Sequence, residues 1–236
     1  LDADGAITDH GKAARDLGLH PRLAHMVIRG QALGFGQLAA ELAALLEERD
    51  LLGPGSGADL HERIRMVRGV RPPMGLDTTR LQAVRQAAKR LCREPVSRSV
   101  PGATEVGRVL AQAYPDRIAR RRSGEAPRYQ LSNGKGASLR EHDPMAREDW
   151  LVAADLDGKA REATIYLAAP VDLADLEQDL AAHIEEREEA LWDDKRGMVV
   201  ARHVRKLGAL ILAEKPLQQV APELIQQGLL DAVCRK

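Results

Sequence analysis

The fold class of this 236-residue chain is decided within residues 104–134, TEVGRVLAQAYPDRIARRRSGEAPRYQLSNG. Residues 104–113 predict a helix, but after Tyr114-Pro115 the repeat of apolar side chains shortens from about 3.6 residues to about 2, the period of a strand. Asn133-Gly134 is typical of a tight turn between antiparallel strands. We therefore predict an α+β protein, with an N-terminal helical bundle followed by a small antiparallel β-barrel.

Upstream of this stretch, the apolar pattern predicts helices over residues 20–33, 37–50, 60–68 and 76–93. Pro21 can occupy the first position of a helix, because its missing N–H would have no partner there. Residues 1–19 are too short and too rich in turn signals for a domain of their own. We expect them to be the tail of a preceding module, and the chain to be a fragment of a longer protein.

Downstream, residues 128–131, 150–155 and 163–168 predict strands, and residues 114–119 are a plausible first strand. Four or five short antiparallel strands within residues 114–171 predict an OB-like barrel.

The C-terminal segment begins with a predicted helix over residues 172–182 and ends with another over 223–233. Residues 184–192 could continue the first of these helices, or they could pair with residues 198–204 around a turn at 193–197. We favour the hairpin because it places opposite charges across from each other. The expected cross-strand pairs are Trp192–Met198, Ala190–Val200, Glu188–Arg202 and Glu185–Arg205.

Charge is sorted along the chain, although 35 basic and 35 acidic side chains give a formal net charge of zero. Residues 59–140 carry 18 basic and 7 acidic side chains, a net charge of +11. Residues 141–194 carry 4 basic and 17 acidic side chains, a net charge of −13. The basic segment is typical of a surface that faces phosphate, but the two segments can equally neutralise each other within the fold.

Composition excludes several classes of protein. Apolar runs are far shorter than the roughly 20 residues of a membrane span, so we expect no membrane partner. Cys92 and Cys234 are too few for a disulfide framework or a zinc site, which fits a reducing, cytoplasmic location.

Motifs of catalysis are missing as well. Residues 34–39, GFGQLA, match a dinucleotide-binding pattern, but a predicted helix precedes them where that fold requires a strand. Residues 53–57, GPGSG, lack the Lys-Ser/Thr of a phosphate-binding loop. No nucleophile signature and no histidine pair at metal-ligand spacing is present, so we predict no catalytic centre and no metal site.

Several segments of the sequence resemble one protein family. Residues 1–8 (LDADGAIT), Gly11 and residues 19–26 (LHPRLAHM) resemble the helicase-associated region that comes after the two RecA-like domains of DEAH/DExH-box helicases. Residues 113–122 (AYPDRIARRR), 129–134 (YQLSNG) and 150–152 (WLV) resemble that family's OB-like domain. Residues 192–197 (WDDKRG), 199–202 (VVAR) and 206–210 (KLGAL) are similar to the segment C-terminal to the barrel in its bacterial HrpB branch.

The resemblance implies a division of the chain into four parts. Residues 1–19 would be the tail of a winged-helix module, forming its last strand, and residues 20–113 a ratchet-like helical domain. Residues 114–171 would be the OB-like barrel, and residues 172–236 a C-terminal extension. ATP and Mg²⁺ would bind between the RecA-like domains of the parent helicase, so this fragment itself would hold no cofactor.

The resemblance also implies partners, which are single-stranded RNA or DNA held by its backbone, and the RecA-like domains of the same chain. An aromatic fraction of 3% is too low for a stacking platform, which favours phosphate contacts. The candidate contacts on the barrel are Arg117, Arg120, Arg121, Arg122, Arg128 and Lys135. On the helices they are Arg85 and Lys89, one turn apart.

Alternatives stay open for these residues. Strand alternation sends Arg120 and Arg122 to one face and Arg121 to the other. The arginines could also be solvated, or could pair with the acidic residues of 143–157. The whole fragment could instead be a protein-interaction scaffold that docks on the motor domains, or on a partner protein, without touching nucleic acid.

Overall fold

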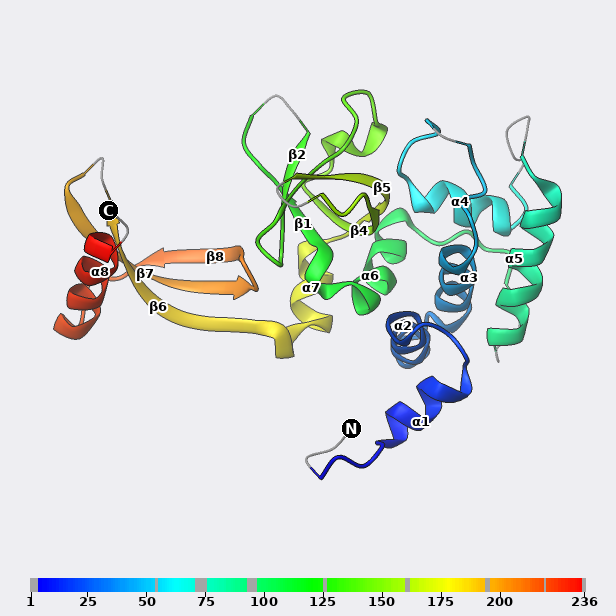
Figure 1. Cartoon of the computed structure of the whole chain (residues 1–236), viewed down its shortest axis with the longest axis horizontal. Coiled ribbons are helices and arrows are strands. Elements are labelled where there is room, and N and C mark those ends of the chain that lie inside the picture. The colour runs from blue at the N-terminus through cyan, green and yellow to red at the C-terminus, as the bar shows by residue number, and fades with distance from the viewer. Residues whose placement is uncertain are drawn as a thin grey trace.

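Helices fill the first half of the chain and strands most of the second half, as Figure 1 shows from blue to red. The structure is a computed structural model, and it describes residues 4–53, 55–70, 76–92, 97–124, 127–159, 162–193, 196–218 and 220–234. The order of elements confirms the α+β class. The helices of the first half are α1 (Asp9–Asp16), α2 (Pro21–Ala32), α3 (Gly36–Glu47), α4 (Leu60–Val67), α5 (Thr78–Leu91) and α6 (Ala103–Ala113).

Local signals determine where these helices begin. Pro21 occupies the first position of α2, as predicted, and the Nδ1 atom of His20 accepts the backbone N–H of Arg22. α5 begins at Thr78 rather than at residue 76, because the Asp77 side chain caps it by accepting the Arg80 N–H at 3.0 Å.

Residues 4–19 contain a helix, so the strand expected in this part of the chain is wrong. The Thr8 side chain accepts the Gly11 N–H at 3.1 Å and starts α1, a capping signal that the sequence analysis missed. The assignment of residues 1–19 to a winged-helix module stays a prediction.

α1 packs on α2 through two histidines. His25 Nδ1 lies 2.9 Å from His10 Nε2, a hydrogen bond that needs at least one neutral ring. Burial lowers the pKa of His25 below its ordinary value of 6.5, and the charges of His10, Arg29 and His183 lower it further. A histidine whose pKa is lowered in the folded state stabilises the fold above its ordinary pKa, and that stability is lost as the pH falls.

We therefore expect α1 to loosen from α2 when the pH falls from about 7.5 to about 5. Amide hydrogen exchange of residues 9–16, corrected for the intrinsic effect of pH, will show protection at the higher pH and faster exchange at the lower. In His10→Ala, exchange of residues 9–16 will be fast at both pH values. His142 is exposed, so His142→Ala will behave like the wild type. Equal protection of α1 at both values in the wild type would contradict this prediction.

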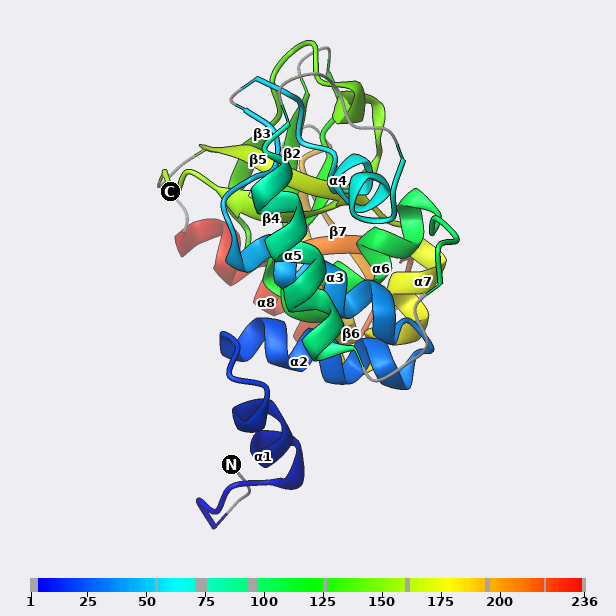
Figure 2. The same ribbon diagram turned by 90° about the vertical axis from the view of Figure 1, so that its right-hand side faces the viewer.

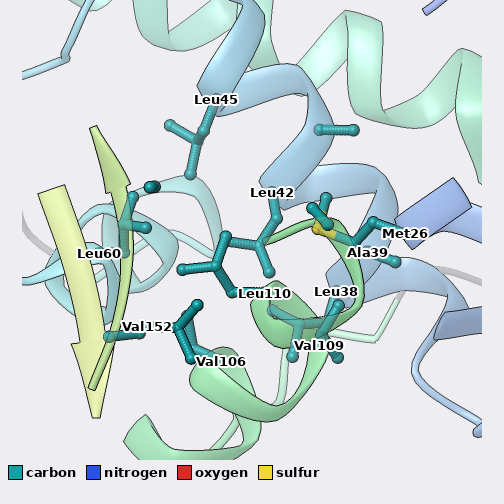
Figure 3. Packing of buried hydrophobic residues seen from close by; sticks show 14 of the residues in the cluster. Met26, Leu38, Ala39, Leu42, Leu45, Leu60, Val106, Val109, Leu110 and Val152 are labelled. Atoms are coloured by element: carbon teal, nitrogen blue, oxygen red, sulfur yellow. The ribbon is translucent and has the colours of Figure 1, made fainter. Parts of the chain in front are cut away.

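α3 is the centre of the helical core. Its apolar residues Leu38, Leu42 and Leu45 are nearly inaccessible to solvent and face α2, α5 and α6, as the predicted apolar stripe requires. Figure 3 shows Leu42 against Leu110 of α6, with Leu60 and the barrel residue Val152 beyond them. One hydrophobic cluster therefore extends from the helices to barrel residues such as Val152, and a second cluster fills the interior of the barrel.

The strands of the second half first close into a five-stranded barrel in the order β1-β2-β3-β5-β4. Its strands are β1 (Ile118–Arg121), β2 (Arg128–Leu131), β3 (Gly136–Ser138), β4 (Trp150–Leu156) and β5 (Glu162–Pro170). β1 begins at Ile118 instead of residue 114, because Pro115–Arg117 form a short 3-10 helix, η1. β3 runs parallel to β5, so the expectation of a purely antiparallel barrel is wrong; closing the barrel brings together two strands that are not consecutive.

Tyr129 fills the interior of the barrel among Leu131, Leu151 and Ile165. Its hydroxyl donates to the carbonyls of Met145 (3.2 Å) and Glu148 (3.0 Å), which lie in and after the 3-10 helix η2 (Pro144–Arg147). Burial raises the pKa of Tyr129 to about 12, so the hydroxyl keeps the proton that it donates.

A separate three-stranded sheet comes after the barrel and α7 (Leu173–Asp179). A short 3-10 helix, η3 (Ala181–His183), leads into its strands β6 (Ile184–Asp193), β7 (Met198–Leu207) and β8 (Leu210–Pro216), and the chain continues into α8 (Pro222–Cys234). The choice of a β-hairpin over a helix for residues 184–192 is confirmed. β8, which pairs with β7 and makes the hairpin a sheet, was not predicted.

The predicted register of this hairpin is wrong by one residue. Asp193 belongs to β6 and faces Met198, so Glu189 rather than Glu188 faces Arg202. The turn is shorter than expected, since the Gly197 N–H donates to the Asp193 carbonyl at 2.8 Å and Gly197 adopts a φ of +62°. The ion pairs of the sheet match the observed register, with Arg202 on Glu189 at 2.7 Å and Arg205 on Glu186 at 2.9 Å.

The sheet is anchored to the barrel at the β7–β8 turn. The Ala209 N–H donates to the Ser132 carbonyl at 2.7 Å. Gly208 has a φ of +57°, and a Cβ there would lie 2.3 Å from the same carbonyl oxygen, so only glycine fits. α8, in red in Figure 1, lies against β6 and β7 at the end of the molecule away from the helical region.

Candidate nucleic-acid interface

Three of the predicted barrel arginines use their guanidinium groups to bridge neighbouring elements. Arg117 donates to the Ala154 carbonyl at 2.7 Å and lies over the ring of Tyr114. Arg120 donates to the Ile211 carbonyl of β8 at 2.6 Å, and Arg121 donates to the Arg147 carbonyl at 3.4 Å. Arg120 and Arg121 therefore point to different neighbours, as strand alternation predicts.

The other three barrel cations are exposed. Arg128 pairs with Glu162 at 3.2 Å, whereas the side chains of Arg122 and Lys135 have no ion-pair partner in the described part of the chain. The Arg122 N–H donates to the Arg128 carbonyl, so these two residues share one end of the β1–β2 ladder. Lys135 lies in the β2–β3 turn at the opposite end of β2, so the barrel cations do not gather at one point.

The predicted helical pair, Arg85 and Lys89, lines a cavity of about 690 Å³ between α3, α5 and the end of α4. Arg85 donates to the carbonyls of Met66 and Val67, both at 2.8 Å, and so satisfies the C-terminal end of α4. Lys89 is exposed on the adjacent turn of α5. The structure thus brings these two side chains together, as their spacing predicts.

Two further cations of this cavity were missed by the sequence analysis. Arg68 forms a buried pair with Glu41 at 2.9 Å and also donates to the Ser99 carbonyl. Arg98 is exposed at the rim and makes no ion pair with a described residue. Neither could be placed from its spacing, because both lie at or beyond a helix end and reach the cavity only through the fold.

The buried carboxylate of Glu41 reduces the positive charge of this cavity. Burial raises the pKa of Glu41 above its ordinary value, although hydrogen bonds from Gln37 and Arg68 lower it in part. Arg68 therefore serves mainly to compensate Glu41, whereas neither Lys89 nor Arg98 forms an ion pair with a residue that the structure describes.

The helical and barrel cations form separate groups. α5 lies at the end of the molecule opposite the β6–β8 sheet, with α3, α4 and α6 between it and β1, as Figure 1 shows. In Figure 2 α5 faces the viewer with the barrel strands behind and above it. The eight predicted residues thus do not form one patch, and any single strand that touched both groups would have to cross the helical region.

One group of possible metal ligands is present among the described residues. Asp59, His61 and Glu62 have ligand atoms within 4.8 Å of one another. Asp59 already caps α4 by accepting the His61 N–H at 2.8 Å, and Glu62 pairs with Arg65 at 2.7 Å. The prediction that the chain holds no metal stays a prediction. No helix in the described ranges is long and apolar enough to cross a membrane.

Comparisons with known proteins match this architecture. A family model described as "ATP-dependent RNA helicase HrpB, connector region" matches residues 183–217, which span β6, β7 and β8. The ATP-dependent RNA helicase HrpB of Escherichia coli (strain K12) is 31% identical over 231 residues, covering 96% of this chain and 26% of the relative.

Solved structures agree with the sequence comparison over the whole chain. The crystal structure of the E. coli DExH-box NTPase HrpB gives a TM-score of 0.74 at 31% identity and covers 100% of this chain and 27% of that one. A crystal structure of the Escherichia coli DEAH/RHA helicase HrpB gives a TM-score of 0.72 at 27% identity, covering 100% and 28%.

A helical region, a closed barrel and a sheet that matches the HrpB connector region, in this order, are the architecture of part of a DExH-box NTPase. The chain belongs to the HrpB family and corresponds to a C-terminal part of its members. It spans about a quarter of the length of the relatives that it matches.

Proposed function

We propose that this chain is an accessory module of an ATP-dependent RNA helicase, and that it holds the backbone of a single nucleic-acid strand for the motor domains. The observation that supports this most is the 690 Å³ cavity of the helical region, which is lined by the exposed cations Lys89 and Arg98 and by the amide side chains of Gln82 and Gln86. Such a lining suits phosphate contacts without reading of the base sequence.

The barrel supports the same proposal. Its strand order, closed by a parallel β3–β5 pair, fits a barrel of OB type, a fold that binds oligonucleotides. Arg122 and Lys135 are its free cations, and Arg117, Arg120 and Arg121 keep guanidinium donors beyond those used on carbonyls. ATP hydrolysis with Mg²⁺ would take place in RecA-like domains of the parent helicase, in the cytoplasm.

A binding measurement with this chain and a fluorescent single-stranded RNA or DNA tests the proposal. We expect weak binding without sequence preference at about 50 mM salt, weakening as salt rises. The change Lys89→Ala with Arg98→Ala will lower the slope of log K against log salt by about 1.4, since each phosphate contact on a single strand contributes about 0.7. Arg121→Ala with Arg122→Ala tests the barrel surface in the same way.

The matched control is Lys12→Ala with Arg15→Ala, which removes the same charge from exposed sites on α1. If the wild type does not bind at about 50 mM salt, or if the control weakens binding as much as the cavity variant, the module does not hold the strand in this cavity.

The match to the connector region supports a second role. We infer that the β6–β8 sheet couples this module to the motor domains of the same chain, with Glu185 and Glu188 exposed on β6 as contacts. Mixing the chain with separately made RecA-like domains, in the absence of nucleic acid, tests this role. A complex that forms equally well with Glu185→Gln and Glu188→Gln would show that this edge is not the contact.

A further inference from the structure

A second cavity, of about 530 Å³, lies where the helical region meets the barrel. The loop between α3 and α4 forms one wall, the start of α5 another, and barrel residues the third. In Figure 1 this cyan loop lies beside β5. The residues that give it chemical character are Arg49, Arg80, Arg140 and Tyr166.

Hydrogen bonds hold the loop against the barrel. The Ala58 N–H donates to the Asp143 carboxylate at 2.8 Å, and the Ala58 carbonyl accepts the Ala168 N–H of β5 at 2.8 Å. Gly55 and Gly57 have φ values of +95° and +78°, a conformation that favours glycine. Hydrogen bonds between the two regions therefore fix the shape of the cavity.

Two of its arginines are available for a ligand. Arg49 and Arg140 are exposed, and neither side chain forms an ion pair with a described residue. Arg140 reaches over the loop, where its Nη1 atom lies 3.7 Å from the position of a Cβ on Gly55. Arg80 is partly engaged, because it donates to the Asp50 carbonyl at 3.0 Å and pairs with Asp77 at 3.5 Å.

The two carboxylates of the lining are already satisfied. Asp50 pairs with the buried Arg63 at 2.7 Å. Asp143 accepts the N–H groups of Ala58 and Met145, at 2.8 and 3.0 Å. The hydrogen bonds to Asp143 leave its negative charge in place, but the lining holds three arginines (Arg49, Arg80 and Arg140) against two carboxylates. The mouth of the cavity therefore keeps a net positive charge, which favours an anion.

Tyr166 adds a flat aromatic surface to this positive mouth. Tyr166 lies on β5 between Ile165, which is buried inside the barrel, and Leu167, which packs against the helical core. The Tyr166 side chain itself is 43% exposed. An aromatic ring in the same cavity as two exposed arginines offers a base a stacking surface and offers the flanking phosphates two counter-charges.

We propose that this cavity binds one nucleotide unit of a single nucleic-acid strand, with Tyr166 stacking on the base and Arg49 and Arg140 binding the adjacent phosphates. This inference rests on the proposed function and adds a contact that the helical cavity does not supply. It places the strand across the junction of the helical region and the barrel.

The experiment measures binding of a fluorescent single-stranded oligonucleotide, containing 2-aminopurine, to the whole chain and to four variants. We expect Tyr166→Ala to weaken binding about tenfold and to relieve the quenching of 2-aminopurine, whereas Tyr166→Phe keeps both. Arg49→Ala with Arg140→Ala will weaken binding and lower its salt dependence, whereas the α1 control Lys12→Ala with Arg15→Ala will not. Far-UV circular dichroism verifies that each variant is folded, and the exposure of all these side chains makes that the expected result.

The outcomes separate this inference from the proposed function. If the wild type binds no oligonucleotide, both fail. If the wild type binds and the Tyr166 and arginine variants bind equally well, only the nucleotide site is overturned. If the double arginine variant binds weakly while Tyr166→Ala matches the wild type, the cavity attracts phosphate alone and the stacking role is wrong.

Discussion

Arg63→Ala will lower the free energy of unfolding by about 3 kcal/mol, the low end of the range for breaking a buried ion pair. The Arg63 side chain is 2% exposed and donates to both carboxylate oxygens of Asp50, at 3.0 and 2.7 Å. It also donates to the Asp59 carbonyl at 2.9 Å. Removing it leaves a carboxylate without its counter-ion, and Asp50 recovers only part of its hydration because its side chain is 30% exposed.

Arg65→Ala on the same helix is the matched control. Arg65 pairs with Glu62 at 2.7 Å, but both side chains are well exposed, so its loss will change stability by no more than about 0.5 kcal/mol. Urea denaturation of the two variants measures the difference. Equal stabilities would mean that Arg63 does not hold Asp50.

The same pair connects stability to the proposed nucleotide site. Arg63 fixes Asp50 at one side of the cavity and lies 3.4 Å from the Ser56 hydroxyl of the loop at the other. We therefore expect Arg63→Ala to lose oligonucleotide binding together with stability. The double change Asp50→Asn with Arg63→Ala will recover part of the stability, because it also removes the unpaired negative charge of Asp50.

The helical core was predictable because its signal is local. The spacing of Leu38, Leu42 and Leu45 depends only on the period of a helix, and the structure buries all three. The choice of strand for residues 184–192 was predictable for a similar reason, since a turn signal and two runs of strand residues lie next to each other.

Long-range features were not predictable from one sequence. The hairpin register depended on whether Asp193 belonged to the strand or to the turn, and one residue there changes every cross-strand pair. β3 is three residues long and pairs with a strand that comes after β4 in the chain, so no local pattern marks it.

The candidate site was predictable in composition but not in geometry. The basic segment contains Arg85, Lys89 and the barrel arginines, yet the sequence does not show that Arg117 and Arg120 donate to backbone carbonyls. Arg49, Arg140 and Tyr166 lie in three distant segments, and only folding brings them to one cavity. Strand alternation, which is local, did predict the divergence of Arg120 and Arg121.

Gly107→Ala will destabilise the protein by about 2 kcal/mol or more, because α6 lies directly against the backbone at the end of β5. A Cβ on Gly107 would be 2.0 Å from the Pro170 carbonyl oxygen and 2.7 Å from its carbonyl carbon. Backbone atoms cannot rotate away as a side chain can, so α6 would have to move. Alanine's better helix propensity, about 1 kcal/mol, will recover only part of this cost.

Gly102→Ala, at the N-terminus of the same helix, is the control for Gly107→Ala. The nearest atoms to a Cβ there are those of the flexible Glu105 side chain at 3.7 Å or more, so its effect should stay below about 1 kcal/mol, the preference of an N-cap for glycine over alanine. Thermal unfolding will show one transition for both variants, at a clearly lower temperature for Gly107→Ala, because α6 belongs to the core that joins the helices to the barrel. If the two variants unfold at the same temperature, α6 and β5 are farther apart than the structure places them. The contact between α6 and β5 would then not couple the unfolding of the helical region to that of the barrel.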